Sequence, residues 1–363
     1  MRALRSFSGV RRPPISAALL CVFCLGSLAT AQDVTTAQER QIGEIDDAIA
    51  DFRQLTSASA ATVAISRGTE LLYSRGYGFS DRRQRIETTA RNSMRLASCT
   101  KPFTCAAIRQ LIDEGLINAD QTVFDYLAVQ PDGPGLADER VRQITVAHLL
   151  DHLGGWDRNT TTDPMYELER IRRELRISRM QKHHIVRYMW SQPLQADPGS
   201  VEHYSNFGYL LLGLVIEKAT GKSYIEAIRE RVAEPAGIDN LWISSNRQQN
   251  RLSHEIFYPA DNQLNLHLRD SASGLSTTAE SLCRFMETWW MDGHERTDRR
   301  RRFFYQFGSH PFTTTTIMEQ RLDGLNYAIM LNSRREDHFN ADNDTIRDRF
   351  NQVLDEVKSE LGE

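Results

Sequence analysis

The stretch MRLASCTKPFTCAAIRQLIDEGLI, residues 94–117, decides the fold and carries the first candidate chemistry. After Ser98, apolar residues recur at helical spacing as far as Glu114, and Gly115 indicates the end of the helix. Pro102 is compatible with the first turn, where no backbone donor is needed. Lys101 follows Ser98 by three residues, so a helix places both side chains on one face.

This Ser-x-x-Lys spacing indicates nucleophilic catalysis. A serine hydroxyl attacks a carbonyl only when a base takes its proton. A lysine amine can be that base if burial or a nearby cation lowers its pKa. The N-terminus of the helix also favours the negative charge that develops there. Taken alone the spacing is a weak signal, because a capped helix start followed by a surface lysine has the same pattern.

A second candidate group is Tyr204-Ser205-Asn206, which directly precedes an apolar helical pattern that starts at Phe207. A tyrosine phenol beside a lysine ammonium can relay a proton. An asparagine amide can bind both a lysine and a substrate carbonyl. The structural alternative is an asparagine N-cap with a packed tyrosine.

In the rest of the sequence, strand-like patterns lie near both ends of the chain and helical patterns fill the middle. The predicted strands are 61–66, 70–77, 313–320 and 325–332, and the predicted helices are 37–55, 98–114, 145–153, 166–179, 182–190, 207–220 and 344–361. This order predicts an α/β fold: an antiparallel sheet built from both chain ends and flanked by helices, with a mostly helical inserted domain. The sheet-containing part is predicted at 32–105 and 256–363, and the helical part at 106–255.

Together these segments resemble the serine β-lactamase and penicillin-binding protein superfamily. They are most similar to its class C-like branch, which includes family VIII esterases and D-aminopeptidases. The resemblance spans about Ile42 to Leu361 and rests on 94–117, 144–158, 198–224, 271–286, the last hairpin and the last helix. It implies a β-lactamase/transpeptidase-like fold and a serine hydrolase of esterase or peptidase type that acts through an acyl-enzyme. The implied catalytic residues are Ser98, Lys101 and Tyr204, with no metal or cofactor.

The third motif of the family departs from its pattern. The family has Lys or His, then Ser or Thr, then Gly, and the matching stretch here is Gln306-Phe307-Gly308-Ser309. The resemblance implies that the substrate-binding residues are Asn206, Gln306, Gly308 and Ser309. The backbone N–H groups of Ser98 and Ser309 would then form an oxyanion hole.

Because the cation and hydroxyl of that motif are missing, we expect esters or amides to be preferred over β-lactams. Phe307 adds apolar contact if its ring faces the groove. Two alternatives remain at this stage. One is a true β-lactamase or D-Ala-D-Ala carboxypeptidase in which Arg321 or Arg334 supplies the cation. The other is a non-catalytic binding protein on the same fold.

Charge excludes one class of partner. The net charge is −4, and residues 1–31 hold four Arg and no acidic residue, which leaves 40 basic against 48 acidic residues in the remainder. Such a chain is not suited to bind nucleic acid, where phosphate contacts dominate affinity. We therefore expect a small-molecule or peptide substrate, and the oligomeric state stays open.

A histidine pattern and a set of aromatic residues allow further interpretations. His148-Leu149-Leu150-Asp151-His152 has the spacing of an inverted zinc motif, with Asp in place of Glu, and makes a zinc hydrolase the distant alternative. Aromatic side chains that either line an apolar pocket or pack in the core are Trp156, Trp289, Trp290 and Phe307.

The first 31 residues are predicted to be a signal peptide. An Arg-rich start precedes a short apolar stretch, 15–31, that ends in Ala29-Thr30-Ala31. We expect cleavage before Gln32 and export to the periplasm or the medium, with no stable membrane span afterwards; an uncleaved anchor is the alternative. Two of the five cysteines lie in this segment. The others, Cys99, Cys105 and Cys283, are predicted to be buried free thiols.

Overall fold

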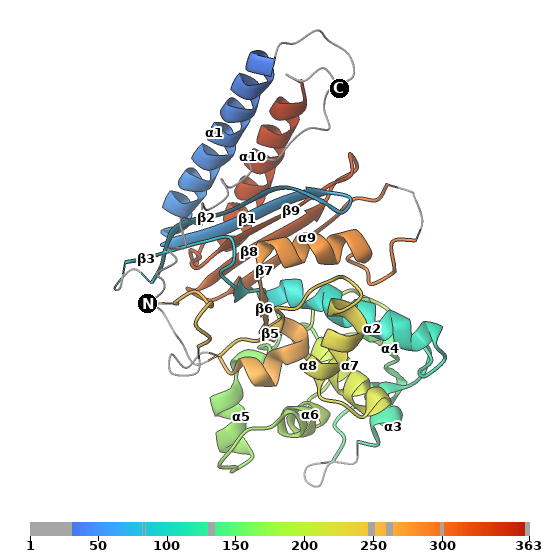
Figure 1. The fold of residues 1–363 in the computed structure, drawn as a ribbon. Coiled ribbons are helices and arrows are strands. Elements are labelled where there is room, and N and C mark those ends of the chain that lie inside the picture. Colours follow the sequence, from blue (N-terminus) through green and yellow to red (C-terminus); the bar gives the residue numbers. More distant parts are fainter. Residues whose placement is uncertain are drawn as a thin grey trace, which may run out of the picture.

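A six-stranded antiparallel sheet forms the centre of the computed structural model (Figure 1). Within the 363-residue chain, the structure describes residues 31–81, 83, 85–129, 135–245, 251–258, 264–297 and 301–359. The strand order is β3-β2-β1-β9-β8-β7. The bounds are β1 (Ala60–Arg67), β2 (Glu70–Asp81), β3 (Ile86–Glu87), β7 (Phe304–His310), β8 (Thr314–Gln320) and β9 (Leu325–Leu331). Because β1 pairs with β9, the two ends of the chain meet at the centre of the sheet, as the predicted fold class requires.

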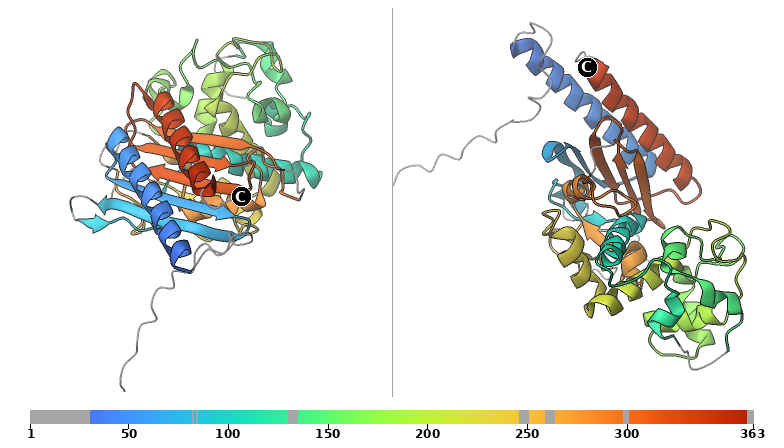
Figure 2. Two further views of the ribbon diagram at one scale, coloured as in Figure 1. Left: turned by 90° about the horizontal axis from the view of Figure 1, so that it is seen from above. Right: turned by 90° about the vertical axis from the view of Figure 1, so that its right-hand side faces the viewer.

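Alternating side chains give the sheet two buried faces. On one face, Val63, Ile65 and Ile329 pack beneath the terminal helices α1 (Ala31–Thr56) and α10 (Phe339–Ser359) (Figures 1 and 2). On the other face, Ala64, Ala328 and Met330 join the larger core, which also contains residues of α9 (Ala279–Thr288). The terminal helices therefore cover one face and leave the other for the helical region.

The middle of the chain is helical and lies on the α9 side of the sheet (Figure 1). Its α-helices are α2 (Lys101–Asp113), α3 (Val123–Leu127), α4 (Val146–Leu150), α5 (Leu168–Glu174), α6 (Lys182–Trp190), α7 (Asn206–Thr220) and α8 (Tyr224–Ile228). Short 3-10 and π turns connect them: η1 (Ala97–Thr100), η2 (Glu139–Gln143), η3 (Pro164–Tyr166), η4 (Arg229–Ala233), η6 (Leu266–Arg269) and η7 (Asp270–Gly274). Helix α7 is buried over most of its surface, as expected for a helix that is apolar on nearly every side.

Two predicted helices are shorter than expected, for one reason. The helix predicted at 145–153 ends at Leu150, and His152 has a φ of +58°. The helix predicted at 166–179 ends at Glu174, and Arg176 has a φ of +52°. A residue in the left-handed region cannot continue a right-handed helix.

A small second sheet was not predicted. It contains β4 (Met94–Arg95), β6 (Leu275–Thr277) and β5 (Trp242–Ile243), in that order. Strands of two or three residues are too short to show a period-two pattern. This sheet ties the segment that leads into Ser98 to the segment around residue 275.

The cysteine prediction is confirmed, because Cys99, Cys105 and Cys283 are all free and buried. The predicted signal peptide lies outside the described residues up to position 30, and α1 begins at Ala31. Within the described ranges, no helix combines the length and apolar character needed to cross a bilayer.

Candidate active site

Ser98 lies in η1, a single turn that continues directly into α2. The residue before it, Ala97, is fully buried and has a φ of +47°, which is unusual for a residue with a Cβ. Such conformations persist only when the surrounding structure holds them, and they cluster at functional sites. Lys101 is the first residue of α2, and its Nζ lies 3.4 Å from Ser98 Oγ. The structure therefore brings this pair together.

Tyr204 and Asn206 reach the same point from the junction before α7. The Tyr204 hydroxyl donates to Ser98 Oγ at 2.6 Å, and Asn206 Oδ1 accepts from Lys101 Nζ at 2.7 Å. The cap of α7 is Ser205, whose side chain accepts from the Gly208 N–H at 3.0 Å. Because Ser205 caps the helix, the Asn206 side chain is available to Lys101.

Lys101 is nearly inaccessible to solvent. The pKa of Lys101 is lowered to about 7, chiefly by burial; the carboxylate of Asp163 opposes this shift and the charge of Arg158 adds to it. The ammonium also donates to the carbonyl of Ala272 in η7 at 2.9 Å and lies 4.6 Å from the centre of the Tyr204 ring. Near neutral pH both protonation forms of Lys101 are populated, so this amine can accept a proton and return it.

The pKa of the Tyr204 phenol is shifted in the opposite direction from that of Lys101. Burial raises its pKa, while the hydrogen bond to Ser98 and the charge of Arg158 act in the other direction. The guanidinium of Arg158 lies 4.5 Å from the centre of the ring. Tyr204 is therefore a neutral hydrogen-bond donor in the resting site.

Two residues of this site, Asp163 and Arg158, were not singled out as functional from the sequence, and a third, His152, was considered only as a zinc ligand. Asp163 Oδ2 accepts from Asn206 Nδ2 at 2.6 Å. The His152 ring lies 4.6 Å from that of Tyr204, and its Nδ1 accepts from the Ser205 N–H at 3.2 Å. Burial lowers the pKa of His152 to about 3, so this ring is neutral. No local pattern sets Asp163 and Arg158 apart, and the zinc-like pattern marks His152 for a different role, so only proximity in the fold reveals all three as members of this site.

The zinc-like segment does not converge on one point. His148 Nδ1 accepts from the Thr145 N–H at 3.3 Å as part of the cap of α4, whereas His152 bonds to Ser205. Among the residues the structure describes, no group of three or more His, Cys, Asp or Glu could hold a metal ion. Both histidines instead satisfy backbone N–H groups.

Strand β7 forms the opposite wall of the site, where Gly308 has a steric role. A Cβ at this position would lie 2.0 Å from the Leu96 carbonyl oxygen and 3.1 Å from the Cys99 nitrogen. Only glycine lets the strand pack this closely against the turn that carries Ser98.

The polar side chains of Gln306 and Ser309, near Gly308, form hydrogen bonds within the sheet and to Arg334. The Gln306 amide donates to the Phe307 carbonyl at 2.9 Å. The Ser309 hydroxyl donates to the Thr314 carbonyl at 3.3 Å and accepts from Arg334 Nη1 at 2.9 Å.

The Phe307 ring does not face the groove, so the condition for its apolar contact with substrate is not met. Its ring packs against the core beneath α1 and α10, on the other face of β7 from Gly308, because successive side chains of a strand alternate. Trp289 and Trp290 are buried, and Trp156 is buried beside a small hollow that Tyr204 also lines.

The two arginines considered as substitute cations both have carboxylate partners. Arg334 makes a bidentate pair with Glu336, with distances of 2.9 and 2.7 Å. Arg321 bonds to Asp323 and Asp355. Neither guanidinium therefore replaces the cation of the family motif as an isolated charge.

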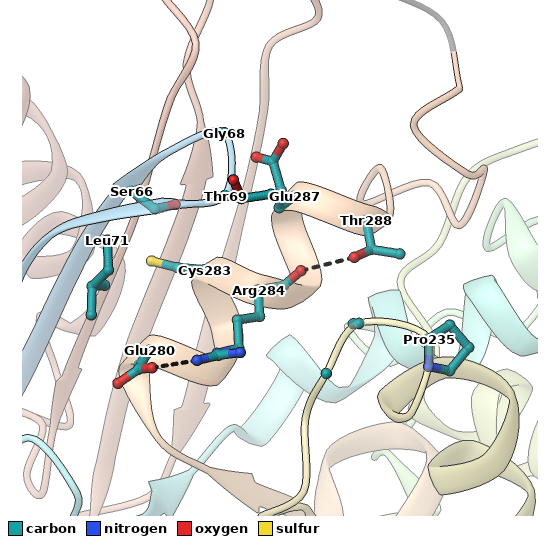
Figure 3. A pocket seen from close by; sticks show the side chains of 12 residues that line it. Ser66, Gly68, Thr69, Leu71, Pro235, Glu280, Cys283, Arg284, Glu287 and Thr288 are labelled. Atoms are coloured by element: carbon teal, nitrogen blue, oxygen red, sulfur yellow. Dashed lines mark hydrogen bonds and ion pairs between the residues drawn. The ribbon is translucent and has the colours of Figure 1, made fainter. Parts of the chain in front are cut away.

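A separate cavity of about 340 Å³ lies between the β1–β2 turn and α9 (Figure 3). Its lining residues include Gly68, Cys283 and Glu287. Glu280 and Arg284, one turn apart on α9, form an ion pair in its wall. The lining residues of this cavity do not include Ser98, Lys101, Tyr204 or Asn206.

Comparison with known proteins identifies the family of this chain. The family profile named Beta-lactamase matches residues 45–344, so the chain belongs to the beta-lactamase family, and the resemblance predicted from the motifs is confirmed. Esterase EstB of Burkholderia gladioli is 31% identical over 59% of this chain and 53% of its own. Penicillin-binding protein 4* of Bacillus subtilis is 29% identical over 54% of this chain and 41% of its own. The chain thus spans about half the length of these two relatives.

Solved structures support the fold. The D-amino acid amidase of Ochrobactrum anthropi SV3, in complex with L-phenylalanine, aligns with a TM-score of 0.69 over 90% of this chain and 99% of its own. Sequence identity in that alignment is 18%, so the likeness concerns the fold alone.

Proposed function

We propose that this protein is an exported serine hydrolase that acts through an acyl-enzyme. One observation carries the proposal: Ser98 Oγ lies 2.6 Å from the Tyr204 hydroxyl and 3.4 Å from the amine of Lys101, whose pKa burial lowers to about 7. A nucleophile, a base of suitable pKa and a neutral phenol in mutual contact are what acyl transfer requires.

In this mechanism Ser98 Oγ attacks the substrate carbonyl carbon. Because Tyr204 donates to Ser98, the serine proton is free to point towards Lys101, whose lone pair accepts it in the neutral form. The backbone N–H groups of Ser98 and Ser309 would stabilise the oxyanion. The proton then passes to the leaving group through Lys101 or Tyr204. A water molecule, deprotonated by the same groups, releases the acyl product and restores Ser98.

For the substrate class we propose neutral esters or amides in preference to β-lactams or peptides that end in D-Ala. A substrate carboxylate at β7 would meet the neutral Gln306, and the nearby Arg334 is already neutralised by Glu336. The loss of one charge-assisted hydrogen bond corresponds to about 1.5–3 kcal/mol. Among the relatives, one is named Esterase EstB and another putative D-alanyl-D-alanine carboxypeptidase, so the names of similar proteins cover both substrate classes.

A substrate panel tests this proposal. We expect kcat/KM for a short-chain nitrophenyl ester or a D-amino acid amide to exceed that for a chromogenic cephalosporin, with the Ser98→Ala variant as the blank. A better rate with the cephalosporin would favour a true β-lactamase. If no substrate is turned over and a fluorophosphonate does not label Ser98, the non-catalytic binding protein is the correct alternative.

The export step is tested separately. Mass spectrometry of material secreted by a bacterial host should show a mature chain that begins at Gln32. A species that retains residues 15–31 would favour the uncleaved anchor.

A further inference from the structure

Asp163 stands at the far end of a chain of hydrogen bonds that leads to the nucleophile. Its Oδ2 accepts from Asn206 Nδ2 at 2.6 Å, and Asn206 Oδ1 accepts from Lys101 Nζ at 2.7 Å. Lys101 Nζ in turn lies 3.4 Å from Ser98 Oγ. Three side chains of this series are buried: Asp163, Asn206 and Lys101. Water therefore does not compete for the hydrogen bonds between them.

The carboxylate selects one orientation of the Asn206 amide. In the observed orientation the amide donates to Asp163 and accepts from Lys101. After a flip, the NH₂ group would face the ammonium and the oxygen would face the carboxylate, and both contacts would be repulsive. With a neutral group at position 163, only Lys101 would select the orientation.

We propose that Asp163 is a positioning residue of this site, which fixes the amide of Asn206 and thereby the reach of Lys101 towards Ser98. This inference rests on the acyl-enzyme function proposed above, since it assigns a role within that site. Asp163 touches neither the nucleophile nor the carbonyl carbon it would attack, so it acts through its neighbour.

The charge of Asp163 also affects the pKa of Lys101, which can be measured. Asp163 is the largest of the influences that raise the pKa of Lys101 against the effect of burial. The other titratable or charged groups that face this amine are Cys99 and Cys105 from η1 and α2, Tyr204 and Tyr209 from the α7 segment, and His152 and Arg158 from the loop after α4. Since Asp163 is the one carboxylate among them, loss of its charge should lower the pKa of Lys101.

A purely structural role for Asp163 is the alternative, because its Oδ1 also accepts from the Met165 N–H at 2.9 Å and caps η3. Asp163→Asn keeps the size and this acceptor but removes the charge. Asp163→Ser also keeps a capping acceptor and serves if the first variant does not fold. The matched control is Asp157→Asn: Asp157 lies six residues earlier, and its carboxylate accepts from the Asn159 N–H and the Thr160 hydroxyl.

The experiment uses the small number of lysines. The chain has five, so 13Cε-lysine labelling gives five NMR titrations, and Lys101→Arg assigns the one of interest. We expect the Lys101 midpoint of Asp163→Asn to move to lower pH by roughly 1 pH unit, with no movement in Asp157→Asn. In parallel, kcat/KM for a nitrophenyl ester should fall about 10- to 100-fold, and its acid limb should move to lower pH with the midpoint.

An unchanged Lys101 midpoint in Asp163→Asn, or an equal movement in the Asp157→Asn control, would overturn the inference. The NMR result stands apart from turnover. If the wild-type protein hydrolyses nothing while the midpoint moves as expected, the proposed function fails and the coupling of Asp163 to Lys101 holds.

Discussion

The two walls of the candidate site differ in how they are built. The wall formed by η1, α2 and the start of α7 is a dense network in which Ser98, Lys101, Tyr204 and Asn206 bond to one another at 2.6–3.4 Å. The wall formed by β7 supplies a close backbone approach at Gly308, but the Gln306 side chain bonds to its own strand. The first wall holds the residues to which we assign proton transfer, whereas the second lacks the Lys or His and the hydroxyl of the family's third motif.

This difference indicates that proton transfer and substrate recognition are separable in this fold. Proton transfer needs buried groups at fixed distances, so its residues depend on each other. We infer that recognition of a charged group at the edge strand β7 depends on side chains outside this network, which can change without disturbing it. Variants at Ser98, Tyr204, Gln306 and Gly308 test that separation.

Ser98→Ala should reduce kcat/KM for a nitrophenyl ester by about 10⁴-fold or more, because the nucleophile is absent and the remaining groups act as a unit. The free energy of unfolding, measured in urea, should hardly change, since only one small hydroxyl is lost. Wild-type turnover in this variant would place the activity elsewhere in the molecule.

Tyr204→Phe should reduce kcat/KM by about 10³-fold, since it removes the hydroxyl that donates to Ser98 and keeps the ring beside Lys101. Tyr209→Phe is the control. Its ring also faces Lys101, but its hydroxyl donates to the Leu150 carbonyl, so ester turnover should change less than about 3-fold. Equal losses in both variants would contradict a specific role for Tyr204.

Gln306→Lys should restore a cation to β7 and raise the cephalosporin-to-ester ratio of kcat/KM by about 10- to 100-fold. Gln306→Met has a similar length and no charge, so it should leave the ratio near the wild-type value. If both variants give the same ratio, the missing cation does not determine the preference.

Gly308→Ala should destabilise the protein by about 1–3 kcal/mol in urea unfolding, because the new Cβ would meet the Leu96 carbonyl at 2.0 Å. Gly43→Ala in α1 has no atom within 4 Å of the added Cβ and should be neutral or slightly stabilising. Unchanged stability and activity in Gly308→Ala would show that β7 can move away from the nucleophile turn at no cost.

Much of the fold and the core of the site could be predicted from local patterns. The central hairpin predicted at 61–66 and 70–77 is present as β1 and β2, and 182–190 is helix α6. Ser98 and Lys101 are one helical turn apart, so the sequence alone required them to be neighbours. The pairing of this turn with Tyr204-Ser205-Asn206 came from the resemblance to a known family.

The contacts around the reacting groups depend on tertiary structure, because they join residues that are far apart in the chain. Asp163 meets Asn206 across 43 positions, and Asn206 meets Lys101 across 105. The direction of the Phe307 ring was set by the register of β7 against β8, which places it opposite Ile317 on the face covered by α1 and α10. Hydrophobic periodicity determines which residues of one element share a face, but it carries no information about which elements meet. The sequence therefore determined the reacting groups, and the packing of η1, α7, η3 and β7 decided how those groups are held and what surrounds them.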